Sequence, residues 1–172
     1  MQLNFNYNVV AIADGSPKQL GLLDYLSYYT RFQRDVIVRR TKFDLERAKA
    51  RAHILEGLVI AIANIDEVIK IIKSSKSTVE AKNRLMERFK FTEMQTQAIL
   101  DMRLSRLTNL ETEKLQQELA ELRKLITVLE SILASEKKQY AVVKKELLEI
   151  KKNYARDRKT EIVESFDNYD IT

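Results

Sequence analysis

The apolar positions at the start of the chain alternate with polar ones. Residues 5–13 carry this period of two, which is typical of a half-buried strand. Residues 14–17, Asp-Gly-Ser-Pro, predict a turn, and residues 18–20 predict a short second strand. A hairpin of this size is only marginally stable alone in water. We therefore expect residues 1–20 to be a β segment left from a preceding core domain.

From about residue 22 to about residue 73 the apolar period becomes helical. The clearest seam steps by three and four residues through Leu55, Leu58, Ile62, Ile65, Ile69 and Ile72. A single helix of about 50 residues would be about 75 Å long at the usual rise of 1.5 Å per residue. We assign residues 21–75 to an outgoing coiled-coil helix. Its heptad pattern weakens at residues 39–52, where we expect the arm to flex.

Three capping-box patterns follow the long helix and predict three helix starts. They are Ser77…Glu80, Thr92…Gln95 and Thr108…Glu111. In each, a hydroxyl can accept from a free backbone N–H while the carboxylate or amide three residues later reaches back. These starts predict short helices over 78–89 and 93–103. We assign residues 76–110 to a small globular cluster at the end of the arm.

The last seam is the most regular in the chain. It runs through Leu115, Leu119, Leu122, Ile126, Leu129 and Leu133, and after Glu136 through Tyr140, Val143, Leu147, Ile150 and Tyr154. This pattern predicts a returning coiled-coil helix over 111–155, followed by an extended tail over 156–172. The predicted fold class is mainly α, with a long antiparallel two-helix coiled coil, a helical dimerisation cluster at its tip and a short N-terminal β segment.

The predicted cluster holds more apolar residues than about thirty residues can enclose. They are Leu85, Met86, Phe89, Phe91, Met94, Ile99, Leu100, Met102, Leu104 and Leu107. An apolar surplus of this kind indicates a surface that faces a partner. Because most oligomers are symmetric, we expect a second copy to meet the first tip to tip. The alternative is that this segment is only the core of the cluster.

Composition supports long helices and excludes several kinds of site. The 172 residues include three glycines and one proline, so turns must be few. The chain has no cysteine and one histidine, His53, which excludes disulfides, thiolate metal sites and a histidine-based metal site. No apolar run reaches the roughly 20 residues needed to span a bilayer. The first residues lack a signal-peptide pattern, so we expect a cytoplasmic protein without membrane contact.

The outgoing helix carries a basic stretch that has two competing interpretations, and an internal glycine. Its basic side chains Arg31, Arg34, Arg39, Arg40 and Lys42 are candidates to face a polyanion, or else form a solvated helix face with i,i+4 pairs such as Asp35–Arg39. Gly57 lies inside the helix, where it costs about 1 kcal/mol relative to alanine. Close approach of the returning helix is its expected compensation. His53 is expected to flank the seam without a catalytic role.

Several segments closely resemble the A subunits of bacterial type IIA DNA topoisomerases, which are gyrase and topoisomerase IV. The matching stretches are residues 36–41 (VIVRRT), 50–58 (ARAHILEGL), 85–89 (LMERF), 97–111 (QAILDMRLSRLTNLE), 146–151 (ELLEIK) and 158–162 (RKTEI). They follow the family's order and spacing over residues 5–163. Residues 6–12 resemble topoisomerase IV, whereas 98–104 and 158–162 resemble gyrase. Asn109 replaces the glycine usual in gyrase, so the choice between them stays open.

The resemblance implies the exit-gate dimerisation and coiled-coil arm of such an enzyme, through which the transported duplex leaves during ATP-dependent strand passage. It implies a homodimer through the tip, partnership with the topoisomerase B subunit and transient contact with double-stranded DNA. The five basic side chains of the outgoing helix would then line the DNA cavity. The implied dimer interface comprises Met94, Gln97, Leu100, Asp101, Arg103, Leu104 and Leu107. The alternative is a structural coiled-coil adaptor that dimerises through its tip with no DNA role.

The resemblance also implies that this segment is inactive alone. In the family the nucleophilic tyrosine follows an arginine, and none of the seven tyrosines here does. The parent protein resembles a DNA topoisomerase that hydrolyses ATP. Its magnesium and ATP are used through the partner subunit, so we expect no cofactor and no metal in this segment.

Overall fold

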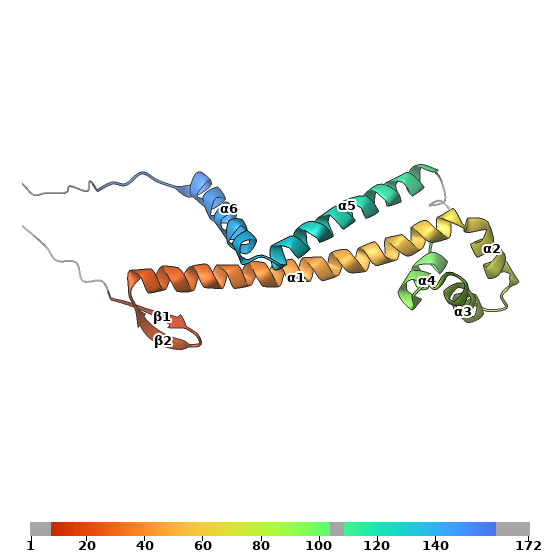
Figure 1. Ribbon diagram of the computed structural model, residues 1–172, viewed down its shortest axis with the longest axis horizontal. Coiled ribbons are helices and arrows are strands. Elements are labelled where there is room, and N and C mark those ends of the chain that lie inside the picture. Colours follow the sequence, from red (N-terminus) through yellow and green to blue (C-terminus); the bar gives the residue numbers. More distant parts are fainter. Residues whose placement is uncertain (1–7, 104–108, 161–172) are drawn as a thin grey trace, which may run out of the picture.

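A computed structural model describes residues 8–103 and 109–160. One long helix runs along most of the length of the molecule (Figure 1). The elements in chain order are β1 (Val9–Ala13), β2 (Ser16–Leu20), α1 (Leu22–Ala63), α2 (Ile65–Ser74), α3 (Thr78–Phe89), α4 (Glu93–Leu100), α5 (Asn109–Leu133) and α6 (Glu136–Tyr154). The predicted fold class is confirmed. The chain is mainly helical, α5 returns along α1, and a β-hairpin precedes them.

The hairpin turns within two residues, which is tighter than predicted. Asp14 and Gly15 both have positive φ, 54° and 76°, the conformation of the two-residue turn that best matches the twist of paired strands. Ser16 and Pro17, predicted to lie in the turn, are therefore the first residues of β2. Residues 5–7 of the predicted strand lie outside the described part of the chain.

The outgoing helix ends at Ala63, and the predicted unbroken helix to residue 73 is wrong. Asn64 takes a non-helical conformation, with its backbone N–H bonded to the Ala61 carbonyl at 3.2 Å. Its side-chain amide donates to the Ile60 carbonyl at 2.9 Å, so asparagine competes for the groups that would continue the helix. The chain then enters α2, which packs against α3.

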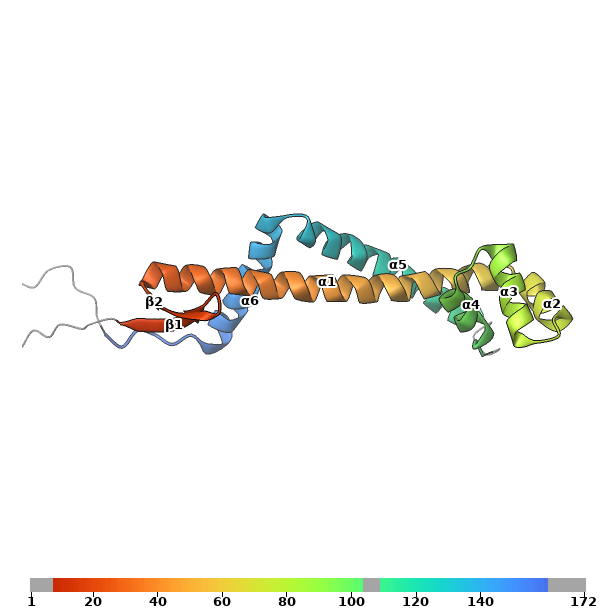
Figure 2. The ribbon, with the colours of Figure 1, turned by 90° about the horizontal axis from the view of Figure 1, so that it is seen from below.

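The returning helix is also interrupted, and the predicted single helix over 111–155 is wrong. It stops after Leu133 and starts again at Glu136. The Gln139 side-chain amide donates to the Leu133 carbonyl at 3.1 Å, which satisfies one carbonyl left free at the break. α5 lies along α1, whereas α6 turns and crosses it (Figure 2).

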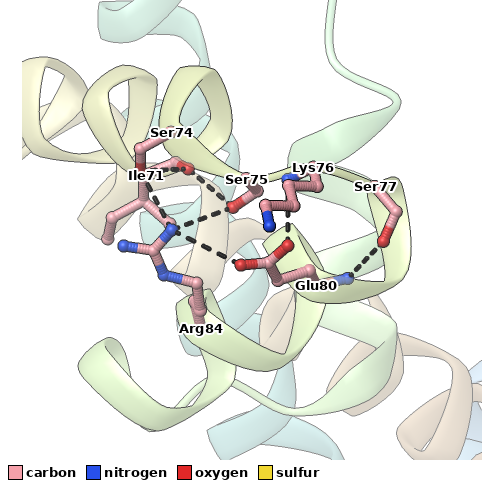
Figure 3. A network of polar contacts seen from close by, with 7 residues as sticks. All are labelled: Ile71, Ser74, Ser75, Lys76, Ser77, Glu80 and Arg84. Carbon is pink, nitrogen blue, oxygen red and sulfur yellow. Dashed lines mark hydrogen bonds and ion pairs between the residues drawn. The ribbon is translucent and has the colours of Figure 1, made fainter.

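A network of side chains holds the corner between α2 and α3 (Figure 3). Ser77 caps α3 by accepting from the Glu80 backbone N–H at 3.2 Å. The Glu80 carboxylate accepts from the Lys76 N–H at 2.9 Å instead of closing the predicted box on Ser77. Arg84 donates to the hydroxyls of Ser74 and Ser75 at 3.0 and 3.3 Å. The predicted helix over residues 78–89 is confirmed at both ends.

The second predicted capping box is complete. The Thr92 hydroxyl accepts from the Gln95 N–H at 3.4 Å, and the Gln95 side chain accepts from the Thr92 N–H at 3.0 Å. α4 begins at the predicted residue but ends at Leu100, three residues before the predicted end. Thr108, the third predicted cap, lies outside the described residues.

Candidate functional site

The largest apolar core lies at the tip of the arm, where five helices meet. It joins side chains of α1, α2, α3, α4 and α5 with Phe91, which precedes α4. Its buried members are Ala52, Leu55, Leu58, Ala61, Val68, Leu85, Phe91, Ile99, Leu115 and Leu119. The rings of Phe89 and Phe91 stack with centroids 5.2 Å apart. This core fixes α3 and α4 at the far end of α1.

The tip encloses more of its apolar residues than the sequence suggests. Leu85, Phe91 and Ile99 are buried, and Met86, Phe89, Leu100 and Met102 are half-buried. The end of α1, together with α2 and α5, supplies the extra cover. Among the described members of the predicted surplus, Met94 is the one that stays largely exposed, at 60%.

The predicted interface residues gather on α4 and just after it. Gln97, Asp101 and Arg103 are exposed, and Leu100 is half-buried. The Gln97 amide donates to the Asp101 carboxylate at 3.0 Å, one turn along the helix. Leu104 and Leu107 lie outside the described residues. The described part of the predicted surface is therefore one exposed methionine with polar side chains around it.

Gln95 joins α4 to α1, a contact that sequence reasoning missed. Its side-chain amide donates to the His53 carbonyl at 2.7 Å. The His53 ring nitrogen Nε2 lies 2.7 Å from the Thr92 hydroxyl. A Cβ on Gly57 would lie only 2.8 Å from Gln95 Cγ. Gly57 thus permits the close approach of α4, and the predicted approach of the returning helix is wrong.

Five ion pairs between described residues tie α1 to the returning helices. They are Arg34–Glu136, Arg40–Glu146 (2.5 Å), Lys49–Glu130 (2.6 Å), Arg51–Glu118 (2.8 Å) and Glu56–Arg123 (2.7 Å). Lys49, Arg51 and Glu56 of α1 all find their partners in α5, and between Lys49 and Glu56 the partner number falls from 130 to 123, as antiparallel helices require. From residue 34 to 40 it rises, because α6 crosses α1 and no longer runs alongside it.

Two of the five basic residues predicted to line a DNA cavity take part in these ion pairs. Arg34 and Arg40 bind carboxylates of α6, and Arg34 also lies over the Tyr140 ring at 5.7 Å. The Arg31 guanidinium lies 5.7 Å from the centre of the Tyr28 ring. Arg39 and Lys42 are exposed and make no ion pair within the described residues. The predicted pair between Asp35 and Arg39 is replaced by a contact of Asp35 with Arg34 at 3.4 Å.

The described residues offer no group of three His, Asp or Glu side chains that could hold a metal ion. Within residues 8–103 and 109–160 no helix is long and apolar enough to cross a membrane. The described residues form a long helical arm with a small cluster of helices at its end.

Comparison with known proteins identifies the family of this chain. A family model for the A subunits of DNA gyrase and topoisomerase IV matches residues 1–148. The chain belongs to this family. It is 51% identical over 171 residues to the DNA gyrase A subunit of Clostridium acetobutylicum, and 50% identical over 163 residues to that of Streptococcus pneumoniae serotype 4.

The matches cover 99% and 95% of this chain but only 21% and 20% of those two gyrase subunits. The chain therefore spans about a fifth of the length of the curated relatives it matches. The resemblance to type IIA topoisomerase A subunits is confirmed. The described residues correspond to a helical part of a gyrase-type A subunit.

Proposed function

We propose that this segment is the exit-gate dimerisation and coiled-coil arm of a cytoplasmic type IIA topoisomerase. In this proposal the transported duplex leaves between two such arms during ATP-dependent strand passage. The observation that carries the proposal is the position of the tip cluster at the end of a 42-residue helix. A helix of that length spans about 63 Å. Two such arms joined only at their tips would enclose a space between them.

The chemistry of the tip supports an interface that opens and closes again. A permanent dimer needs a large apolar surface, whereas a modest interface allows reversible contact. Here Met94 supplies exposed apolar area, and Gln97, Asp101 and Arg103 surround it with polar groups. The proposed partners are a second copy at the tip, duplex DNA in transient contact, and the topoisomerase B subunit. Magnesium and ATP would act through that B subunit, and these residues would hold no cofactor.

The test is the oligomeric state of the 172-residue chain by light scattering. Met94→Glu places a charge in the proposed interface and should weaken dimerisation at least tenfold, which is about 1.4 kcal/mol. Leu104→Glu and Leu107→Glu should do the same. The matched control is Val79→Glu on α3, because Val79 is also exposed, at 68%, but lies outside the predicted interface.

Circular dichroism must show that each variant keeps its helix content. A folded Met94→Glu chain that stays as dimeric as the Val79→Glu control would place the interface elsewhere. The adaptor alternative makes a different prediction in the full-length protein with its B subunit, namely no ATP-dependent change in DNA topology. Introduction of negative supercoils there would indicate gyrase, and relaxation with decatenation would indicate topoisomerase IV.

A further inference from the structure

α6 carries pairs of lysines that repeat every seven residues. The pairs are Lys137–Lys138, Lys144–Lys145 and Lys151–Lys152. All six side chains are exposed. Arg158 and Lys159 continue the same spacing beyond the end of the helix and are exposed as well. The predicted DNA-facing residues on α1 do not include this surface.

Helix geometry arranges the six lysines in two rows. Seven residues advance a helix by about 10.5 Å and return within about 20° of the starting direction. We call residues 137, 144 and 151 row A, and residues 138, 145 and 152 row B. Each row extends about 21 Å along the helix, at 1.5 Å per residue.

The packing of α6 turns these rows toward solvent. Val143 is buried, and the ion pairs of Glu136 and Glu146 hold the helix against α1. At about 100° per residue, row B lies on the side opposite Val143 and row A lies on its flank. The rows therefore stay accessible while the helix remains docked on the arm.

The charge of these lysines is not balanced within the described part of the molecule. None of the six makes an ion pair there. The acids of α6 are Glu136, Glu146 and Glu149, and the first two are bound to arginines of α1. Arg34 and Arg40 of α1 are thus paired with α6, whereas the six lysines of α6 are free for an external anion.

We propose that rows A and B form a sequence-independent binding surface for the phosphate backbone of duplex DNA. The proposal deepens the exit-gate function, on which it rests for the identity of the duplex, by naming the surface of the arm that meets it. About 21 Å of duplex axis carries about 12 phosphate charges, at one per 1.7 Å. Six lysines can therefore each find a phosphate without a fixed register. Lysine acts here as a point charge on a flexible stem and lacks the planar fork of arginine.

A membrane surface fits these observations less well than DNA. An interfacial helix needs its apolar face free to enter the lipid. In α6 that face includes Val143 and the half-buried Leu147, and it is turned toward α1. Leu148 is an exposed apolar residue on the side of row A. Tyr140, Ile150 and Tyr154 are exposed as well, but at about 100° per residue they lie on the side of Val143, away from row B. Leu148 is therefore the one large apolar side chain that accompanies the lysine rows within α6.

The test measures binding of the 172-residue chain to a labelled duplex of about 30 base pairs between 50 and 200 mM salt, where phosphate contacts dominate the salt dependence. Two triple variants change row A or row B from lysine to glutamine. The matched control is Lys70→Gln/Lys73→Gln/Lys76→Gln at the tip, since these lysines are also exposed and the net charge changes equally. A second duplex of unrelated sequence and phosphatidylserine vesicles complete the set.

Each row variant should bind DNA more weakly and lower the slope of log affinity against log salt by about one to three, since each lost phosphate contact removes about 0.9. The control should keep nearly the parent slope, and the two duplexes should bind alike. Row variants that match the control would overturn the proposal, as would vesicle binding that depends on the rows while DNA binding does not. Light scattering separates the two proposals. If the chain is dimeric and the row variants bind DNA as the parent does, only the proposed lysine surface is refuted. If the chain is monomeric but its DNA binding depends on the rows, the exit-gate proposal is refuted.

Discussion

Replacing Gly57 with alanine tests how α4 is held against the arm. The new Cβ would lie 2.8 Å from Gln95 Cγ, 2.9 Å from Gln95 Cβ and 3.1 Å from Gln95 Cδ. Gln95 cannot easily swing away, because its side chain donates to the His53 carbonyl at 2.7 Å and accepts from the Thr92 N–H at 3.0 Å. Its Cβ moves only with the backbone, so α4 itself must shift.

The size of the effect follows from three opposing contributions. Alanine gains about 1 kcal/mol over glycine inside a helix. Overpacking a close contact costs about 1–3 kcal/mol, and each hydrogen bond of Gln95 lost in the shift costs about 1 kcal/mol. We therefore expect Gly57→Ala to lower the free energy of unfolding by about 1–3 kcal/mol in spite of its better helix propensity. At this chain length that corresponds to a fall in Tm of about 2–12 °C.

Thermal unfolding followed by circular dichroism at neutral pH measures this effect. Ala50→Gly, at an exposed position of the same helix, reports the propensity contribution alone. In a Gln95→Gly background the close atoms are gone, so Gly57→Ala should there raise Tm. A double-mutant cycle should accordingly give a coupling of about 2–4 kcal/mol between the two positions, which is the cost of about 1–3 kcal/mol with Gln95 plus the gain of about 1 kcal/mol without it. A rise in Tm on Gly57→Ala with Gln95 intact would refute this explanation of the glycine.

Two further predictions concern ion pairs. Glu118→Gln removes the bidentate partner of Arg51. It should lower the free energy of unfolding by less than about 1 kcal/mol, because both side chains are partly exposed. Thermal unfolding in low salt and in about 1 M salt should show this difference disappearing as the pair is screened. The hydrogen bond from Lys82 lowers the pKa of Glu93 from its ordinary value of 4.5. This contribution to stability is therefore present above that value and is lost as the pH falls through the lower folded-state pKa. Lys82→Met should reduce the fall in Tm between about pH 6 and pH 3, and an unchanged fall would contradict the role of the pair.

Local sequence signals predicted the short helices well. The bounds of α3 agree with the prediction because Ser77 caps one end and Lys90, in a left-handed conformation with φ 56°, ends the other. Thr92 and Gln95 likewise locate the start of α4. Signals of this kind depend on neighbouring residues, so a single sequence contains all the information they need.

The two helix breaks were missed because the apolar period passes straight through them. Ile62 and Ile65 flank Asn64 at the spacing of a continuous seam. Leu133 and Tyr140 keep the seam spacing across the second break, with the polar Glu136 between them. The sequence signal that marks the first break comes from polar residues. Asp66 and Glu67 fall in the first turn of α2, where acids stabilise a helix start. An asparagine followed by two acids was a better guide to this boundary than the isoleucines.

The tip surface was overestimated for a related reason. Counting apolar residues within 76–110 ignores the cover that distant segments bring. Leu55 and Leu58 of α1 and Leu115 of α5 enclose the cluster, and Gly57 lets α4 come close enough to be covered. These contacts join residues about 40 to 60 positions apart, which no local pattern reports.

The break before α6 explains why the basic surfaces of the two arm helices differ. A helix that continued along α1 would keep the antiparallel partner order seen from Lys49 to Glu56. Because α6 crosses α1, its acids Glu136 and Glu146 bind Arg34 and Arg40. Each of these contacts neutralises one arginine of α1 and one carboxylate of α6, so Glu149 is the one acid of α6 left beside its six exposed lysines. The change in chain direction between Leu133 and Glu136 thus leaves free positive charge on the returning helix as well as at Arg39 and Lys42 of the long helix, where the sequence alone suggested it.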